Sequence, residues 1–364
     1  MRITGFEVFL LGLPADEPLG LEPANPNGKR PNVLLLLQTD AGVEGVGFTF
    51  LGAGLSRALK VAVEDMATLC IGFDPAQHDA IIARIVAAAG GSGPAGIFTL
   101  ALAAIDIALW DIRAKVAGQP LWQLLGADGS RVPTYASGAL MRELDLDAIQ
   151  RSCGRLVAAG HRQVKMQLAL PGEHRPDVEI DRIRRIREAL GPDVALMCDI
   201  NQRWSVQRAI EMGEALAEFD LTWIEDPAPA DDFPGQARAN AALPMPVAAG
   251  EYIYGLSGFR LLLDLAPPDF VMIDPFRAGG ITPWLKIARL AEALGKPVVS
   301  HLAPEIQLHL IAAIPNGYTV EYMPWSYAMF KDVPWPKAGY LELGEAPGLG
   351  LEPDRAAIAR FQLS

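Results

Sequence analysis

Cysteine is scarce in this sequence, and no segment is long and apolar enough to cross a membrane. The chain has 364 residues and three cysteines, Cys70, Cys153 and Cys198. Three distant cysteines do not make a disulfide framework, so we expect small buried side chains in a reducing compartment. No run of about 18 apolar residues occurs, and the N-terminus has no long apolar core before a small-residue cleavage site. We therefore expect a cytoplasmic protein that has no signal peptide and does not bind a membrane.

Positive charge is also in short supply. The chain has 31 Lys and Arg residues against 43 Asp and Glu residues, which gives a formal net charge of −12. Nucleic acids and anionic membranes are bound by clustered Lys and Arg, so this composition argues against both partners. No GxGxxG or Walker sequence follows a predicted strand, which disfavours a nucleotide-binding protein. An acidic protein can still bind a small anion when a metal ion supplies positive charge.

The opening residues, 1–128, predict an α+β capping domain. Residues 1–13 and 32–50 alternate as antiparallel strands do, and residues 55–125 follow helical patterns. Residues 96–118 are apolar nearly all round, which is typical of a buried helix. Strands followed by helices indicate the α+β class.

Two segments of this domain are candidate lids over a site. Residues 15–31 are rich in Pro, Gly and Asn and are too long for a tight hairpin, so we expect a mobile loop there. Residues 47–54 form the second candidate segment. We expect substrate specificity to depend on both.

Strand-like and helix-like patterns alternate from about residue 130 onward. The strand-like runs are VPTYAS (132–137), QVKMQL (163–168), VALMCD (194–199), LTWIED (221–226), PVAAGE (246–251), FVMID (270–274), PVVSH (297–301) and YTVEY (318–322). Apolar strands that alternate with amphipathic helices indicate a parallel sheet covered by helices. Eight such units predict a closed (β/α)8 TIM barrel over residues 129–325, whose site lies at the C-terminal ends of the strands. A doubly wound open sheet is the alternative.

Acidic residues recur at the ends of three successive predicted strands. Asp199, Glu225 and Glu251 are each 26 residues apart, one strand and helix per step. Parallel strands deliver these carboxylates to one rim, where they would repel one another unless a cation lay between them. Oxygen ligands alone select a hard ion, so we predict a Mg²⁺ site. Asp226 follows Glu225 directly, and we expect it to face away and to cap a helix.

A histidine and two more acids end the following strands. His301 ends one strand, Asp274 ends its neighbour, and Glu321 lies near the end of the last. A histidine beside a carboxylate predicts a general base, because the carboxylate holds the ring and supports its charged form. We interpret the four other histidines as structural: His78, His161, His174 and His309.

One predicted strand carries polar residues inside the barrel. Side chains two apart share a face of a strand, so Lys165 and Gln167 point together while Val164 and Met166 point the other way. A lysine in the middle of a strand is too deep to be a surface residue. We therefore place Lys165 and Gln167 in the predicted site.

These motifs together resemble the enolase superfamily, in its mandelate racemase subgroup. The resemblance covers nearly the whole chain and is carried by ALAAIDIALWDIRAKVAGQPLWQLLG, CDINQ, WIEDP, AAGE, IDPFRAGGIT and SHLAPEI. It implies abstraction of the proton α to a carboxylate, with Mg²⁺ holding an enediolate. It also implies that residues 326–364 pack back on the capping domain and that the chain forms a homo-oligomer.

The resemblance further implies roles for individual residues. Asp199, Glu225 and Glu251 would bind Mg²⁺, and His301 with Asp274 would be the base on one face of the substrate. Glu321 would hydrogen-bond a substrate carboxylate oxygen, and Lys165 would neutralise that carboxylate. Asn201 would lie beside the metal, and we expect Asn201, Gln167 and Tyr135 to contact the substrate.

The sequence departs from the subgroup at Gln167. The subgroup usually has Lys-x-Lys in this strand, whereas this chain has Lys165-Met166-Gln167. An amide cannot accept a proton, so one of the two opposed bases is missing. One base can still serve a β-elimination, which leads us to expect a dehydratase of a hydroxy acid or acid sugar.

Two alternatives to the dehydratase stay open. A racemase, epimerase or cycloisomerase could use Lys165 or another group as its second base. A metal-dependent carboxylate binder without catalysis would not need the His301–Asp274 pair. Trp325 and Tyr327 either line the substrate pocket or belong to the core.

Overall fold

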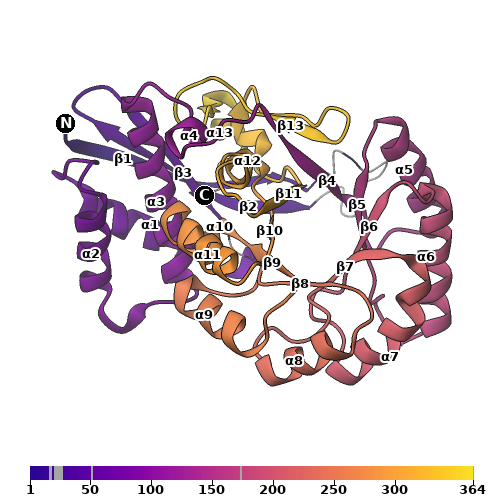
Figure 1. The fold of residues 1–364 in the computed structure, drawn as a ribbon. Helices are drawn as coiled ribbons and strands as arrows, with labels where there is room; N and C mark the ends of the chain where they lie inside the picture. The colour runs from indigo at the N-terminus through magenta and orange to yellow at the C-terminus, as the bar shows by residue number, and fades with distance from the viewer. Residues whose placement is uncertain (16–18, 20–27, 51, 173, 364) are drawn as a thin grey trace.

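The computed structural model describes residues 1–15, 19, 28–50, 52–172 and 174–363. They form a capping domain, a barrel and a C-terminal segment that crosses from the barrel to the cap (Figure 1). Most of the 15–31 segment lies outside the described residues. Within the described residues, no helix is both long and apolar enough to span a bilayer. All three cysteines are buried and free, as predicted.

The capping domain is a three-stranded antiparallel sheet covered by helices. Its strands, in sheet order, are β1 (Ile3–Pro14), β2 (Lys29–Thr39) and β3 (Glu44–Thr49). Its helices are η1 (Ala53–Leu55), α1 (Ser56–Cys70), α2 (His78–Ala89), η2 (Gly90–Ser92), α3 (Ile97–Val116) and α4 (Leu121–Leu124). As the sequence predicts, α3 is buried along most of its length.

Helix α3 packs directly on β3 because β3 carries glycine at the contact. A Cβ atom on Gly47 would lie 1.9 Å from the carbonyl oxygen of Ala104, so no side chain fits there. Asp111 in α3 accepts a hydrogen bond from Val46 N at 2.8 Å and another from Leu349 N at 2.8 Å. This buried carboxylate thereby ties α3 to both the sheet and the C-terminal segment.

Eight parallel strands close into the predicted barrel. They are β4 (Arg131–Leu140), β5 (Gln163–Gln167), β6 (Ala195–Asp199), β7 (Leu221–Glu225), β8 (Val247–Ala249), β9 (Phe270–Ile273), β10 (Val298–Ser300) and β11 (Gly317–Tyr322). Pairing of β11 with β4 closes the ring. The doubly wound alternative is therefore wrong.

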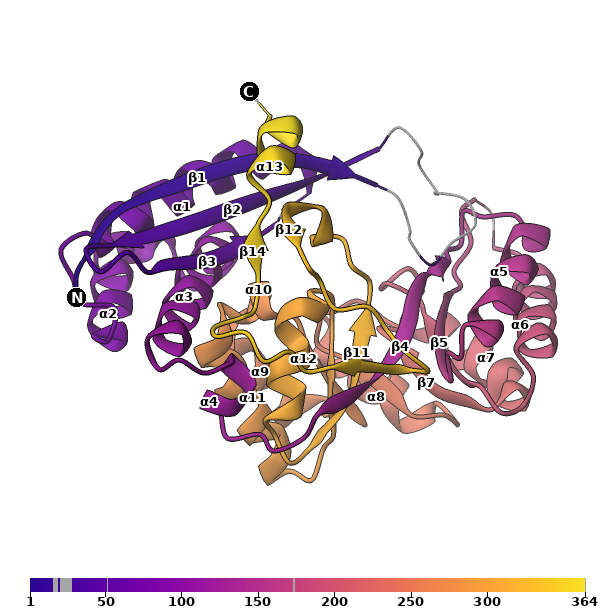
Figure 2. The same ribbon diagram turned by 90° about the horizontal axis from the view of Figure 1, so that it is seen from above.

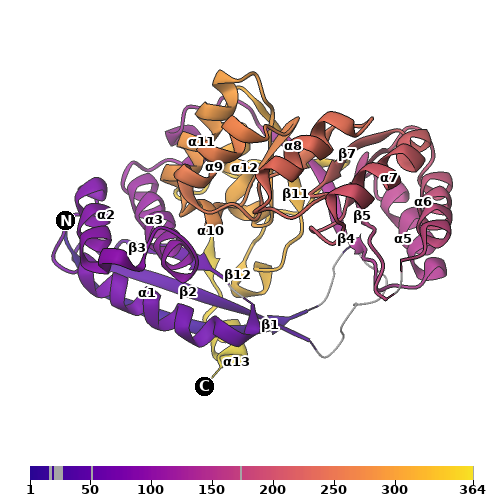
Figure 3. The ribbon, with the colours of Figure 1, turned by 90° about the horizontal axis from the view of Figure 1, so that it is seen from below.

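Helices surround the barrel. They are α5 (Leu146–Ala158), α6 (Pro176–Leu190), α7 (Val206–Leu216), η3 (Ala217–Phe219), α8 (Phe233–Ala242), α9 (Gly255–Leu265), α10 (Pro275–Ala278), α11 (Ile281–Ala293) and α12 (Pro304–Ala312). Figure 3 shows this helical shell from below, with the cap on one side. Apolar strand residues such as Val164 and Met166 face the helices and are fully buried, which leaves the alternate positions for the barrel interior.

The C-terminal segment contacts both domains. It contains η4 (Tyr327–Met329), β12 (Phe330–Lys331), β13 (Tyr340–Glu342), β14 (Glu352–Pro353) and α13 (Arg355–Phe361). Strand β13 pairs antiparallel with β4 of the barrel. Helix α13 lies against the cap sheet (Figure 2), and there Leu363 N donates to Leu10 O at 2.8 Å and Arg355 Nη1 donates to Glu7 Oε2 at 2.8 Å.

A buried acid in α12 makes stability depend on pH. Glu305 is 1% exposed, and burial raises the pKa of its carboxyl from 4.5 to about 7. As pH rises, the unfolded chain therefore releases this proton at a lower pH than the folded protein does. The free energy of unfolding decreases by about 3 kcal/mol as the pH rises from the unfolded pKa of 4.5 to the folded pKa of about 7. We expect Glu305→Gln to remove most of this decrease in urea denaturation at about pH 5 and about pH 8.

A matched control for this variant is Glu345→Gln, which changes an exposed carboxyl in the same way. It should leave the pH dependence of the parent protein unchanged. An equal pH dependence in Glu305→Gln and the parent protein would refute the prediction.

Candidate active site

Strand register brings the three predicted metal acids to one end of the barrel. Asp199 and Glu225 are direct partners in the β6–β7 pairing, and Glu251 follows two residues after β8. They are 2%, 0% and 3% exposed, respectively. The parallel strands thus place three buried carboxylates on one rim, as their spacing predicts.

Lys165 of β5 extends into the middle of this acidic rim. Its Nζ atom lies 2.5 Å from Glu225 Oε1, 2.7 Å from Glu321 Oε1 and 3.9 Å from Asp199 Oδ2. Burial alone would lower the pKa of this lysine, but the charges of Glu225 and Glu321 outweigh burial and raise it well above its usual value. Lys165 is therefore a fixed cation.

The acids around Lys165 carry more negative charge than one lysine balances. Burial raises the pKa of Asp199 to about 6 against the pull of Lys165. Burial likewise raises the pKa of Glu225, whose second oxygen, Oε2, accepts a hydrogen bond from Trp223 Nε1 at 3.0 Å. A further cation at this rim would lower both pKa values.

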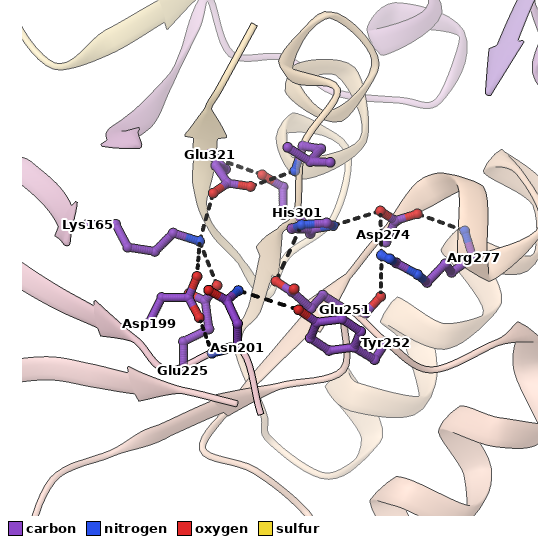
Figure 4. Close-up of polar contacts among 12 residues, drawn as sticks. Lys165, Asp199, Asn201, Glu225, Glu251, Tyr252, Asp274, Arg277, His301 and Glu321 are labelled. Atoms are coloured by element: carbon purple, nitrogen blue, oxygen red, sulfur yellow. Dashed lines mark hydrogen bonds and ion pairs between the residues drawn. The ribbon is translucent and has the colours of Figure 1, made fainter. Parts of the chain in front are cut away.

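His301 and Asp274 form the predicted pair on the opposite side of the site (Figure 4). His301 Nδ1 lies 2.7 Å from Asp274 Oδ2. Asp274 Oδ1 accepts hydrogen bonds from the backbone N–H groups of Phe276 and Arg277, so the carboxylate is held rigidly. With Nδ1–H donating to Asp274, the free His301 nitrogen is Nε2, which lies 3.4 Å from Glu251 Oε2.

The charges around this pair favour a basic histidine. Burial would lower the pKa of His301, but Glu251 and Asp274 outweigh burial and raise it. Burial would raise the pKa of Asp274, yet the hydrogen bond from His301 and the charge of Arg277 bring it below its usual value. The geometry is that of an oriented general base.

Glu321 is held as an anion between Lys165 and the backbone. Its Oε2 accepts a hydrogen bond from Leu302 N at 2.6 Å. Burial opposes ionisation, but Lys165 and His301 outweigh burial and lower the pKa of Glu321. In this arrangement Glu321 positions Lys165, and its predicted hydrogen bond to a substrate carboxylate oxygen stays a prediction.

The donor atoms at the rim suit a hard divalent ion. Among the described residues, no three His, Cys, Asp or Glu side chains already converge as ligands, because Glu225 pairs with Lys165 and Glu251 lies beside His301. The donor set is nevertheless all oxygen and buried, and Glu251 Oε2 accepts no hydrogen bond from the part of the chain that the structure describes. Asp199, Glu225 and Glu251 would hold Mg²⁺, which prefers such ligands.

Asn201 and Gln167 lie beside the rim, as expected for substrate contacts. Asn201 Nδ2 donates to the hydroxyl of Tyr252 at 3.4 Å, and its backbone N donates to Asp199 Oδ1 at 2.8 Å. Gln167 pairs with Asp199 in the β5–β6 register and lies on the same face of β5 as Lys165. Their contact with substrate stays a prediction.

Tyr135 lies deeper than we expected. It is completely buried, its hydroxyl donates to Ser300 O at 3.1 Å, and its ring lies 5.6 Å from Lys165 Nζ. It packs with Trp223 in the interior of the barrel. Its contact with the substrate stays a prediction.

A cavity of about 260 Å³ lies where the cap meets the barrel. Phe50, Phe276, Leu302 and Trp325 line it, together with Lys29, Arg30, Pro31, Asn32, Phe48, Gly52, Ala303 and Ser326. Leu302 follows His301 directly, so the cavity adjoins the His301–Asp274 pair. Tyr327 is buried, and its hydroxyl donates to Pro334 O at 2.7 Å.

Sequence reasoning overlooked Arg277 and misplaced Asp226. Arg277 Nη1 donates to Glu251 O at 3.0 Å and lies 3.4 Å from Asp274 Oδ2; its position three residues after Asp274 was the available signal. The predicted cap at Asp226 is wrong, because α8 begins seven residues later and Asp232 caps it. Asp226 is instead buried at the rim.

Comparison with known proteins agrees with this geometry. Residues 22–126 match the mandelate racemase/muconate lactonizing enzyme N-terminal domain, and residues 148–357 match the enolase C-terminal domain-like family. The chain belongs to the enolase superfamily. The superfamily membership and the TIM-barrel fold predicted from the sequence are both confirmed.

Relatives within the enolase superfamily act on acid sugars. The L-talarate/galactarate dehydratase of Salmonella typhimurium is 33% identical over all of this chain and 92% of its own. The 3,6-anhydro-α-L-galactonate cycloisomerase of Streptomyces coelicolor is 30% identical over 90% of this chain and 91% of its own.

A solved structure shows the same arrangement of domains. The L-talarate dehydratase of a Polaromonas species, complexed with Mg and L-glucarate, superposes with a TM-score of 0.90 and is 29% identical. The match covers 100% of this chain and 98% of the Polaromonas chain. That structure contains Mg, the ion that the sequence of this chain predicts.

Proposed function

We propose that this enolase-superfamily member is a magnesium-dependent dehydratase of an acid sugar or related hydroxy acid. The observation that carries the proposal is the asymmetry of the site. One oriented base, His301 with Asp274, stands on one side, and a lysine held as a cation stands on the other (Figure 4). One base suits an elimination, whereas reversible racemisation needs a group on each face that can also accept a proton, and a lysine held as a cation does not accept one.

The first step is removal of the proton α to the substrate carboxylate. His301 Nε2 accepts that proton, and Asp274 stabilises the charged ring through the 2.7 Å contact to Nδ1. Lys165 supplies a fixed positive charge for the carboxylate as negative charge develops on it, in a site that is shielded from water. When bound, Mg²⁺ supplies Lewis-acid stabilisation of the same carboxylate.

The second step expels the β-hydroxyl group. His301 Nε2–H returns its proton to that oxygen, the C–O bond breaks, and water leaves. The remaining enol takes a solvent proton at the β-carbon and becomes a 2-keto-3-deoxy acid. Because the same nitrogen serves both steps, the α-hydrogen and the hydroxyl must lie on one face of the substrate.

The relatives support the substrate class. The dehydratases of talarate, galactarate, D-xylonate and L-rhamnonate act on sugar acids with a hydroxyl β to the carboxylate. Cycloisomerases of related sugar acids also resemble this chain, so cycloisomerisation is the second candidate. Both reactions begin with the same proton abstraction.

Turnover of an acid-sugar library in D₂O with excess Mg²⁺ tests this proposal. We expect a 2-keto-3-deoxy acid with deuterium at the β-carbon, and recovered substrate of unchanged configuration. The His301→Asn variant is the control and should form product about 10³-fold or more slower than the parent protein. Fast inversion at the α-carbon would sink the dehydratase assignment, and product formed only from lactones or anhydro sugars would favour the cycloisomerase.

The cytoplasmic location and the homo-oligomer stay predictions. Size-exclusion chromatography with light scattering would measure the oligomeric state. Cell fractionation would check the location.

A further inference from the structure

Asp226 occupies a fixed position between two strands that carry metal acids. Its backbone N donates to Ala248 O at 3.0 Å, and its carbonyl accepts from Gln202 N at 2.9 Å. Its backbone φ is +40°, in the left-handed region that non-glycine residues rarely adopt. Only 3% of the residue is exposed. Ala248 of β8 and Gln202, which follows β6, therefore hold the backbone of Asp226 in place.

The Asp226 carboxyl has no evident structural task. Helix α8 is capped by Asp232, whose Oδ1 accepts from Gly235 N at 2.9 Å. Asp226 Oδ2 is buried and accepts no hydrogen bond from any described residue. Burying a carboxylate oxygen without a hydrogen-bond partner lowers the stability of the fold by several kcal/mol. We therefore expect a hydrogen-bond donor to contact this oxygen when the protein functions.

The neighbours of Asp226 are the proposed metal ligands. Glu225, which directly precedes Asp226, pairs with Asp199 in the β6–β7 register, and its carbonyl accepts from Ile200 N at 3.0 Å. On the other side, Ala248, which accepts from Asp226 N, lies three residues before Glu251. Asp226 therefore lies at the acidic rim, between the strands that carry Asp199 and Glu251.

We propose that Asp226 is a fourth carboxylate of the metal site and holds the ion through one of its water molecules. Asp199, Glu225 and Glu251 already supply three anionic ligands, and Mg²⁺ keeps several waters in its shell. A carboxylate that accepts hydrogen bonds from such a water orients it and strengthens ion binding. This inference rests on the metal site of the proposed function.

Isothermal titration of the full-length protein with Mn²⁺ tests this role without an activity assay. We expect Asp226→Asn to raise the Mn²⁺ dissociation constant about 10- to 100-fold, the usual effect of losing an outer-shell partner. Asp231→Asn is the matched control, because it removes one exposed carboxylate five residues from Asp226, and it should bind like the parent protein. Asp199→Asn, which alters a direct ligand, should lose more affinity than Asp226→Asn.

Circular dichroism of the metal-free proteins checks the fold, and Asp226→Ser replaces the asparagine variant if that one does not fold. Mn²⁺ affinity equal to the parent in a folded variant, with affinity lost in Asp199→Asn, would overturn the role of Asp226 and leave the metal site standing. Absence of Mn²⁺ binding in the parent protein would overturn the metal site and with it the proposed function.

Discussion

Replacing His301 by asparagine is expected to lower kcat for dehydration by about 10³- to 10⁴-fold, near the upper range for loss of a general acid–base group. His301 accepts the α-proton and returns it to the leaving hydroxyl, and asparagine can do neither. Asparagine keeps a polar side chain in a position that is 12% exposed, so the fold should survive. The rate of 2-keto-3-deoxy acid formation measures the effect on dehydration. The rate of α-proton exchange in D₂O measures the effect of the substitution on the first step, the proton abstraction.

Two further variants show whether this loss comes from chemistry. Asp274→Asn keeps the histidine but removes the charge that supports it, so we expect a smaller decrease of roughly 10²-fold. Both variants should bind Mn²⁺ like the parent protein, because neither residue is a proposed ligand. If His301→Asn retained most of the parent's kcat, another group would have to be the base.

Removing the metal is expected to abolish turnover, and Mg²⁺ should restore it. We expect Asp199→Asn to weaken Mg²⁺ binding and to lower kcat/KM about 10³-fold, because Lewis-acid stabilisation of roughly 4 kcal/mol is lost. Asparagine has the size of aspartate but lacks its charge, so the variant isolates the electrostatic contribution. Dialysis against a chelator, followed by titration with Mg²⁺, measures both quantities.

The Asp231→Asn variant again controls for the change in net charge. It should keep the parent's Mg²⁺ dependence. Full activity of the chelated parent protein, or an unchanged Mg²⁺ requirement in Asp199→Asn, would contradict the assignment of the acidic rim.

The main part of the site followed from the sequence because parallel strands impose a simple geometry. Each strand and helix unit returns the chain to the same rim, so acids 26 residues apart meet there. The alternation of side chains along β5 placed Lys165 inside the barrel for the same reason. The pairing of His301 with Asp274 needed only that neighbouring strands end side by side.

Depth and direction were not available from such patterns. Alternation shows that Tyr135 points into the barrel, but not that it lies beneath Lys165 with its hydroxyl bonded to Ser300. Strand alternation also predicts that Asp226 faces away from Glu225. The backbone of Asp226 leaves the strand conformation with a positive φ, so strand alternation does not apply there, and backbone hydrogen bonds to Ala248 and Gln202 hold it.

By itself, the sequence determined the barrel and the residues that gather at its rim, because these depend on spacing and alternation, and its motifs identified the superfamily. Only the tertiary structure decided that Lys165 is clamped by Glu225 and Glu321, and that Asp226 is buried between the strands of the metal acids. Both results depend on distances across the barrel and on burial, which set the electrostatic energies of charged groups. Segments far apart in the chain create those distances, and no local pattern records them.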